Sequence, residues 1–324
     1  MLITALAAAW LAQAAPAAGP IPAGPQDPPA VPLPRRALPA DTKFVLHFDA
    51  QAFLRSAWWE AARSQSDVLA ALDGSEELRA LREQFGVDPL RDLLSITVLG
   101  GDDRGGDAAV LVRTTDVADG ALATLRKLPV HSALQHRGLE VERWGPQDES
   151  ETLYSASFAT PNGDRVAILG RAPEHVTRVV LAADGVAPRL ADSQRPAVDA
   201  EPSAGTVLYL ELALPFERLL EDTPAAIAGQ YAQRLTVELG ERDGRAFFEA
   251  RVRTKDRGDA RKLADLISGA RALAGNLGLI EQLPLPLQDL YDGLIAEVRD
   301  GEVRLGLALP RKDLLYLARE LQGL

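Results

Sequence analysis

Four histidines are the side chains of this 324-residue chain best suited to acid–base chemistry or metal binding. They are His47, His131, His136 and His175. His131 and His136 are five residues apart, so on one strand they would face opposite sides, and His175 lies where a helix is expected to start. His47 and Asp49 would share one face of a strand, but one imidazole and one carboxylate make only half a site. We interpret the histidines as solvated or singly hydrogen-bonded and keep His47 with Asp49 as a hydrolase candidate.

Two pairs of aspartates recur at matching places in the chain, Asp116 with Asp119 and Asp256 with Asp259. Two carboxylates that flank one bond would suit a glycosidase. Helix capping explains the spacing better: the first aspartate accepts hydrogen bonds from free backbone N–H groups, and the second lies in the first turn near the positive helix end. The pairs therefore predict two helix starts.

The glycine- and aspartate-rich segment 100–107 has carboxylates that suit Ca²⁺. It lacks the order of ligands of an EF-hand loop, so we predict a long hairpin turn instead. The sequence also contains no G-x-S-x-G, S-x-x-K, H-E-x-x-H or Walker motif. These absences weaken the case for an enzyme, and we predict no catalytic, metal-binding or cofactor-binding residues.

Trp58 and Trp59 follow Phe53 and Leu54 on an expected helix. Neighbouring helical residues point about 100° apart, so one tryptophan should face the sheet while the other is more exposed. An exposed tryptophan can anchor a partner, but core or rim packing is the simpler interpretation.

The composition sets limits on the class of protein. Apolar residues make up 47% of the chain and charged residues 25%, as in ordinary globular domains. The net charge of −11 argues against general binding to nucleic acid or to anionic membranes, since both need a basic surface. The absence of cysteine excludes disulfides, thiolate chemistry and a cysteine-linked lipid.

The N-terminus resembles an export signal. Residues 2–12 are almost wholly apolar, and Ala12-Gln13-Ala14 fits a signal-peptidase site, although no Lys or Arg precedes the apolar run. The run is shorter than the roughly 20 residues of a membrane span. We predict a signal peptide over 1–14, a proline- and alanine-rich linker over 15–38, and a periplasmic or extracellular protein without a transmembrane segment.

A repeat organises the rest of the chain. Segments 96–119 and 235–259 both read as strand, Gly/Asp turn and strand ending in Val-Arg-Thr, with Asp-x-x-Asp at the following helix start. Residues 166–173 run beside 303–310, and strand 44–48 resembles 207–210 at a larger offset. The first copy therefore holds extra residues, which include a second helical stretch over 66–85. We predict one module over 39–190 and another over 203–324.

The expected fold class is α+β, with two duplicated β-α-β-β-α-β-β-α modules. Asp243-Gly244, Asp300-Gly301 and Asn162-Gly163 lie between strand-like runs and predict hairpins, hence antiparallel sheets. Helical stretches with one apolar stripe should cover one face of each sheet. One such stripe is Ala118, Ala121, Leu122, Leu125 and Leu128. A ferredoxin-like or related arrangement is the nearest standard design.

The start of the folded region resembles a group of exported, uncharacterised bacterial proteins. The resemblance rests on Leu38-Pro39-Ala40-Asp41-Thr42 before a strand that ends in Asp49, and on Gly86-Val87-Asp88-Pro89 before a later strand. It implies location and architecture and carries no site residues. We therefore expect a non-enzymatic protein that binds an envelope protein or another envelope component. The alternatives are a hydrolase or a small-ligand binder with a site between the modules.

Overall fold

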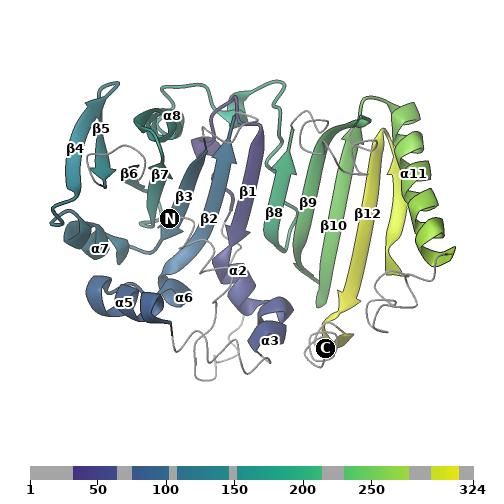
Figure 1. Cartoon of the computed structure of the whole chain (residues 1–324), viewed down its shortest axis with the longest axis horizontal. Coiled ribbons are helices and arrows are strands. Elements are labelled where there is room, and N and C mark those ends of the chain that lie inside the picture. Colours follow the sequence, from purple (N-terminus) through teal and green to yellow (C-terminus); the bar gives the residue numbers. More distant parts are fainter. Residues whose placement is uncertain are drawn as a thin grey trace.

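The computed structural model describes residues 32–63, 75–101, 108–145, 152–213, 230–276 and 293–313. Its strands form one 12-stranded sheet in the order β11-β12-β10-β9-β8-β1-β2-β3-β7-β6-β5-β4 (Figure 1). All strand pairings are antiparallel. The predicted α+β class with an antiparallel sheet is thus confirmed.

The strands of the first half are β1 (Phe44–Asp49), β2 (Leu93–Gly100), β3 (Ala109–Thr114), β4 (His131–His136), β5 (Leu139–Trp144), β6 (Leu153–Ala159) and β7 (Arg165–Gly170). Those of the second half are β8 (Thr206–Leu212), β9 (Ala232–Arg242), β10 (Arg245–Thr254), β11 (Ile295–Arg299) and β12 (Glu302–Pro310). The helices are η1 (Arg35–Ala37), α2 (Ala50–Arg55), α3 (Ala57–Arg63), α5 (Glu76–Phe85), α6 (Pro89–Asp92), α7 (Ala118–Leu125), α8 (Pro173–Ala183), η3 (Leu190–Asp192) and α11 (Arg257–Asn276).

The predicted strands and turns match the structure closely, because alternation and turn chemistry are local signals. Asp243-Gly244 and Asp300-Gly301 both have positive φ angles at the two turn positions, which suits the two-residue turns between β9 and β10 and between β11 and β12. The hairpin β4–β5, which follows α7, was not in the predicted order of elements. The first half therefore has four strands between α7 and α8 instead of two.

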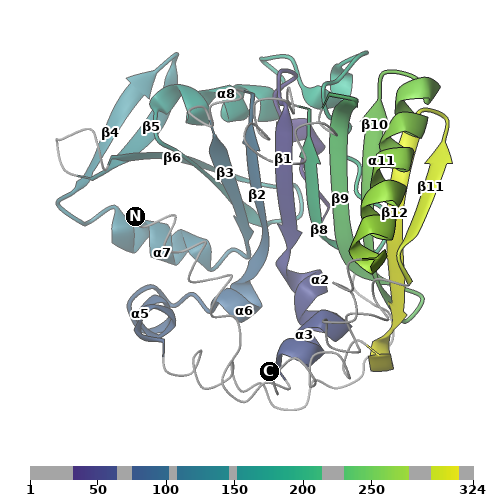
Figure 2. The ribbon, with the colours of Figure 1, turned by 45° about the vertical axis from the view of Figure 1, so that its right-hand side comes forward.

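The two predicted modules lie in one continuous sheet. Their first strands, β1 and β8, pair with each other, with Leu46 opposite Leu210. Residues 39–190 contain β1 to β7 and residues 203–324 contain β8 to β12, so the predicted ranges fall on the two sides of this junction. Figure 2 shows the sheet bending strongly toward its β4–β5–β6 end, while helices α2, α3, α5, α6 and α7 lie along the lower margin.

One row of cross-strand partners defines the faces of the sheet, because residues directly opposite each other share a face. From β7 to β12 the row is Ile168, Leu111, Thr97, His47, Tyr209, Glu238, Glu249 and Gly306. We call the face that carries this row the Glu238 face. It is apolar at the β7 end and charged at the β12 end.

Helices cover the two faces in different halves. In the first half, Val176 and Val179 of α8 pack in the same buried cluster as Leu111 and Ile168, on the Glu238 face. In the second half, Leu263 of α11 clusters with Val303, which points to the opposite face. The helices α8 and α11 therefore cover opposite faces of the one sheet, each in its own half. The expected burial of the apolar stripe of α7 is wrong, since none of the residues of α7 is buried.

The folded part begins before the predicted linker ends. Leu33, Ala37 and Leu38 are buried in the main cluster, and the N–H of Leu190 donates to the carbonyl of Leu38 at 2.8 Å. The connector between the halves, residues 184–205 between α8 and β8, packs there as well, through Leu190 and Val198. Proline-rich composition concealed this packing, because isolated apolar residues without periodicity give no signal in the sequence. The predicted signal peptide and residues 15–31 lie outside the described residues.

Candidate functional site

His47 and Asp49 lie on the same face of β1, as predicted, but both are nearly fully buried. The Nδ1 atom of His47 is 2.8 Å from the hydroxyl of Thr97. Asp49 caps α2, accepting from the N–H of Ala52 at 2.8 Å. Neither residue lines the two pockets on strands β9 to β12, so the geometry assigns both residues to the core.

The other histidines also have structural surroundings. His131 lies against Trp144, with ring centroids 4.6 Å apart. His136 faces α8, with Nδ1 3.1 Å from the Thr177 hydroxyl. Across the parts of the chain that the structure describes, no group of three His, Asp or Glu side chains is arranged to hold a metal ion. The segment 100–107, predicted as a long hairpin turn, lies largely in residues 102–107, outside those parts.

Helix capping holds for one aspartate pair only. Asp256 precedes α11 and accepts from the N–H of Asp259 at 2.9 Å, which confirms the prediction. Before α7 the N-cap is Val117, and no side chain caps the helix. Asp119 lies in the first turn of α7, as predicted, and accepts from Arg165 at 2.7 Å, whereas Asp116 does not cap the helix.

Acidification is expected to loosen the first turn of α11. Backbone hydrogen bonds from Asp259 and Gly258 lower the pKa of Asp256 below its ordinary value of 3.8. A carboxylate with a lowered pKa contributes fully above its ordinary value, and the contribution is lost as the pH falls through the folded-state pKa. Amide protection factors at Gly258 and Asp259 should therefore fall in acid. The Asp256→Asn variant, which keeps an uncharged acceptor, should lack this step; equal acid profiles would contradict the assignment.

One tryptophan is buried and its neighbour is more exposed, as predicted, but the buried one packs against α2 and α5 and does not face the sheet. Trp59 is 6% exposed and packs with Phe53 and Leu78, whereas Trp58 is half-buried. The indole N–H of Trp58 donates to the carbonyl of Gly240 at 3.1 Å, and the N–H of Ala57 donates to Glu241 at 2.6 Å. Helix α3 of the first half is thereby attached to β9 of the second half. Trp58 has a structural role at this contact.

Two buried glutamates fasten the connector to the sheet. Glu238 on β9 has no exposed surface, and it accepts from the Ser203 N–H at 2.8 Å and from the Thr206 hydroxyl at 2.6 Å. Arg251 on β10 forms an ion pair with the same carboxylate. A buried carboxylate needs such compensation, since losing its hydration is costly. The sequence reasoning did not single out Glu238.

Glu211 on β8 repeats the arrangement one strand away. It is 1% exposed and accepts from the N–H groups of Asp199 and Ala200 at 3.0 and 2.7 Å. The Tyr209 hydroxyl donates to it at 2.6 Å. Burial, together with the nearby Glu211 charge, raises the pKa of Tyr209, so this phenol stays a neutral donor. Segment 199–206 is therefore fixed over β8 and β9.

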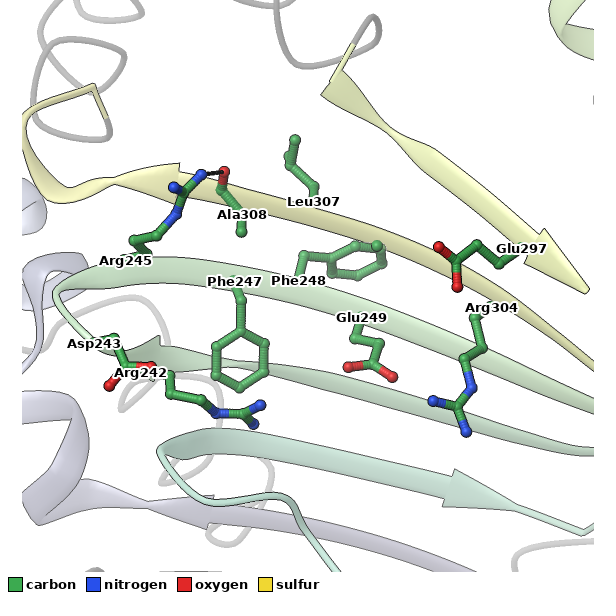
Figure 3. A pocket seen from close by; sticks show the side chains of 11 residues that line it. Arg242, Asp243, Arg245, Phe247, Phe248, Glu249, Glu297, Arg304, Leu307 and Ala308 are labelled. Atoms are coloured by element: carbon green, nitrogen blue, oxygen red, sulfur yellow. Dashed lines mark hydrogen bonds between the residues drawn. The ribbon is translucent and has the colours of Figure 1, made fainter. Parts of the chain in front are cut away.

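Beyond this fixed segment the Glu238 face becomes a groove of about 460 Å³. It crosses β10 and β12 and ends at β11, and its lining comes from the end of β9 as well (Figure 3). Alternation sends Phe247 and Glu249 of β10, and Arg304, Gly306 and Ala308 of β12, to this face. A second hollow of about 360 Å³ lies beside it, lined by Arg253, Arg299, Asp300, Glu302 and Arg304.

The floor of the groove combines an aromatic ring with small residues. The Arg242 guanidinium lies 4.8 Å from the centre of the Phe247 ring, a cation–π contact. Next to Phe247 on β12 is Ala308, followed by Gly306. A Cβ atom at Gly306 would meet no atom within 4 Å, so the space above this glycine is open.

The rim carries balanced charges. Its three arginines are matched in number by three carboxylates: Arg242, Arg245 and Arg304, and Asp243, Glu249 and Glu297. All three guanidiniums are held in place: Arg304 pairs with Glu302 at 2.6 Å, Arg245 donates to the Ala308 carbonyl at 2.9 Å, and Arg242 donates to the Ala204 carbonyl at 3.0 Å. Figure 3 shows the side chains of Glu249 and Arg304 near each other, with Glu297 above them. The groove therefore offers hydrogen-bond donors and acceptors of both charges around an apolar strip.

This groove was missed in the sequence, although a signal was present. Residues 302–308 alternate between apolar positions and the series Glu302, Arg304, Gly306 and Ala308. Residues 245–253 alternate in the same way, with Phe247 among the charged positions. Which of these positions are neighbours depends on the pairing of β10 with β12, and single-strand patterns do not contain that information.

No family model and no curated protein matches the chain. Three solved crystal forms of TP0453 are similar in structure. Form III has a TM-score of 0.43 at 8% identity, over 91% of this chain and 100% of that one. Form I gives 0.43 at 7% over 89% and 97%, and form IV gives 0.44 at 8% over 89% and 96%.

Proposed function

We propose that this protein is an exported, non-enzymatic binding protein that holds an extended polypeptide segment of an envelope partner in the groove across β10 and β12. The observation that carries the proposal is the open floor at Gly306 between charges of both signs. A bound chain would lie over Gly306 and Ala308, with an apolar side chain against Phe247.

The chemistry of the groove favours a polypeptide over other ligand classes. Nucleic acid and anionic lipid need an excess of basic side chains, whereas three arginines here face three carboxylates. A wholly apolar ligand needs an enclosed apolar cavity, and this groove has a charged rim. A polypeptide presents amide donors and acceptors along its length with side chains of either charge, which matches the rim.

Filling the groove should abolish binding without harming the fold. The Cβ atom of a leucine at position 306 would have no other atom within 4 Å, and the φ angle of Gly306 is not in the left-handed region. Gly306→Leu should therefore fold normally. Gly269 on α11 is equally open and serves as the matched control. A displayed library of random linear peptides, selected on the wild-type protein, should yield binders that Gly269→Leu retains and Gly306→Leu loses. Binders retained by both variants would contradict the proposal.

Export is supported by the apolar run over 2–12 and the small residues at Ala12 and Ala14. None of the described helices is long and apolar enough to cross a bilayer. Expression in a bacterium with the native N-terminus should place the protein outside the cytoplasm. Sequencing its N-terminus should give Ala15 as the first residue; a chain that keeps residues 1–14 in the cytoplasmic fraction would exclude export.

The proposed duplication is supported by the order of strands within each half. Read outward from the junction, the first half runs β1-β2-β3-β7-β6 and the second half runs β8-β9-β10-β12-β11. In sequence order both are first, second, third, fifth and fourth, once the inserted hairpin β4–β5 is set aside. Sequences of relatives should show the two halves aligning at the offset seen between Val112 and Val252. Relatives without that similarity would argue against a common origin.

A further inference from the structure

The sheet ends on one side at β4, a strand without the features that usually prevent edge pairing. Strand β4 (His131–His136) pairs with β5 in unbroken register and, within the described sheet, with no other strand. It contains no Asp, Glu, Lys, Arg or Pro. Natural edge strands are commonly protected by charge, proline or a bulge. The other edge strand, β11, is shorter and carries Glu297 and Arg299.

Two backbone N–H groups of β4 point away from the sheet. The turn Arg137-Gly138 has positive φ at both positions, so His136 and Leu139 form the hydrogen-bonded pair that closes the hairpin. Hydrogen bonding alternates along an antiparallel pair, so Ala133 and Gln135 direct their N–H and C=O groups outward. The N–H of His131 also lies on that side but donates to the Leu128 carbonyl at 3.0 Å.

The strand is held in shape at both ends. The His131 ring lies against Trp144, and His136 contacts Thr177 at 3.1 Å and Glu174 at 3.3 Å. A preorganised strand loses little conformational freedom when it pairs, which favours association. Leu128 and Val130, next to the strand, are 42% and 46% exposed and add apolar surface.

We propose that β4 is a dimerisation edge, on which a second copy of this chain adds its own β4 in antiparallel orientation. A two-fold axis perpendicular to the sheet continues each face of one copy into the same face of the other. Because side chains alternate between the faces, each even-numbered residue must then pair with an even-numbered residue, and each odd-numbered residue with an odd-numbered one. Centring the axis on Leu134 places the two Leu134 side chains together. Ala133 of each copy then faces Gln135 of the other, and the four outward N–H groups meet four outward carbonyls.

A second copy fits this edge for two reasons on the strand itself. The two outward donors are two residues apart, so one strand is complementary to its own reversed copy. No like charges meet along the pairing, because the strand has none. If the axis passed through Ala133 instead, Leu134 would lie opposite Ser132. That pairing would also need the N–H of His131, which already donates to the Leu128 carbonyl.

The chain has no cysteine, which makes crosslinking a specific test. Residues facing each other without mutual hydrogen bonds have Cα atoms about 4.5 Å apart, within disulfide range. Under mild oxidation Leu134→Cys should become a covalent dimer of twice the mass of the single chain. Val298→Cys, exposed on the opposite edge strand β11, is the matched control and should remain a monomer.

Sedimentation of the unmodified protein gives an independent measurement. The wild-type protein should shift from monomer to dimer with rising concentration. Ala133→Pro, which removes one outward donor at an edge position where proline is tolerated, should remain monomeric with an unchanged melting temperature. A wild-type protein that stays monomeric throughout, or equal crosslinking of Leu134→Cys and Val298→Cys, would overturn the proposal. Peptide binding in the groove does not depend on either outcome.

Discussion

The Glu238→Ala variant is expected to unfold with a free energy about 3–5 kcal/mol lower than the wild-type protein, the cost typical of removing one partner of a buried ion pair. The Glu238 carboxylate is fully buried and accepts from Ser203 of the connector, from Thr206 at the start of β8, and from Arg251. Without it, these donors have no acceptor there and the Arg251 charge loses its main partner. Denaturant unfolding monitored by tryptophan fluorescence measures the difference.

Glu249→Ala is the matched control for this effect. Glu249 lies directly opposite Glu238 on β10 and has the same charge. Its side chain is 28% exposed, and its contact with Arg251 is long, at 3.5 Å. Removing it should change the unfolding free energy by less than about 1 kcal/mol. If Glu238→Ala and Glu249→Ala were equally stable, the connector would not depend on the buried carboxylate.

Gly240→Ala is expected to cost about 3 kcal/mol or more, because no neighbouring group can move aside cheaply. A Cβ atom at Gly240 would lie 2.1 Å from the Gly205 carbonyl oxygen and 2.8 Å from the Thr206 Cα atom. Both are backbone atoms of the segment that Glu238 holds against β9. The alanine must therefore push the connector away from the sheet, which also disturbs the Gly240 carbonyl bound by Trp58.

The matched control is Gly306→Ala, two strands away on the same face. Its Cβ atom meets nothing within 4 Å, and alanine restricts the unfolded chain more than glycine does. This variant should be as stable as the wild-type protein or slightly more stable. Thermal unfolding of the two variants distinguishes two explanations. A steric clash at Gly240 lowers only the melting temperature of Gly240→Ala, whereas a general destabilisation by side chains on this face would lower both melting temperatures.

The local elements of this fold can be predicted from sequence for a clear reason. A turn such as Asp243-Gly244 depends on φ angles that few residues adopt. The different burial of the neighbours Trp58 and Trp59 depends on the rotation of about 100° between successive helical residues. Both signals lie within a few residues. The apolar spacing of α7 correctly predicts a helix, but burial depends on contacts with distant parts of the chain, and none of the residues of α7 is buried.

The long-range features have no such local signal. Glu238 on β9 and Glu211 on β8 each belong to a series in which polar and apolar residues alternate. A polar residue in such a series predicts a solvent-exposed face. They are buried because the connector crosses the sheet there, and its path depends on contacts between residues up to 35 apart. The groove likewise exists only through the pairing of β10 with β12. Its polar residues appeared in the sequence as an ordinary solvated face.

The most direct test of the central claim is the affinity of one selected peptide for three proteins, measured by titration calorimetry. The groove assignment predicts that wild type and Gly269→Leu bind the peptide equally well, while Gly306→Leu binds it more than about tenfold more weakly, a loss of about 1.4 kcal/mol or more. Equal affinity of all three proteins would contradict the assignment, because the peptide would then bind away from the floor formed by Gly306.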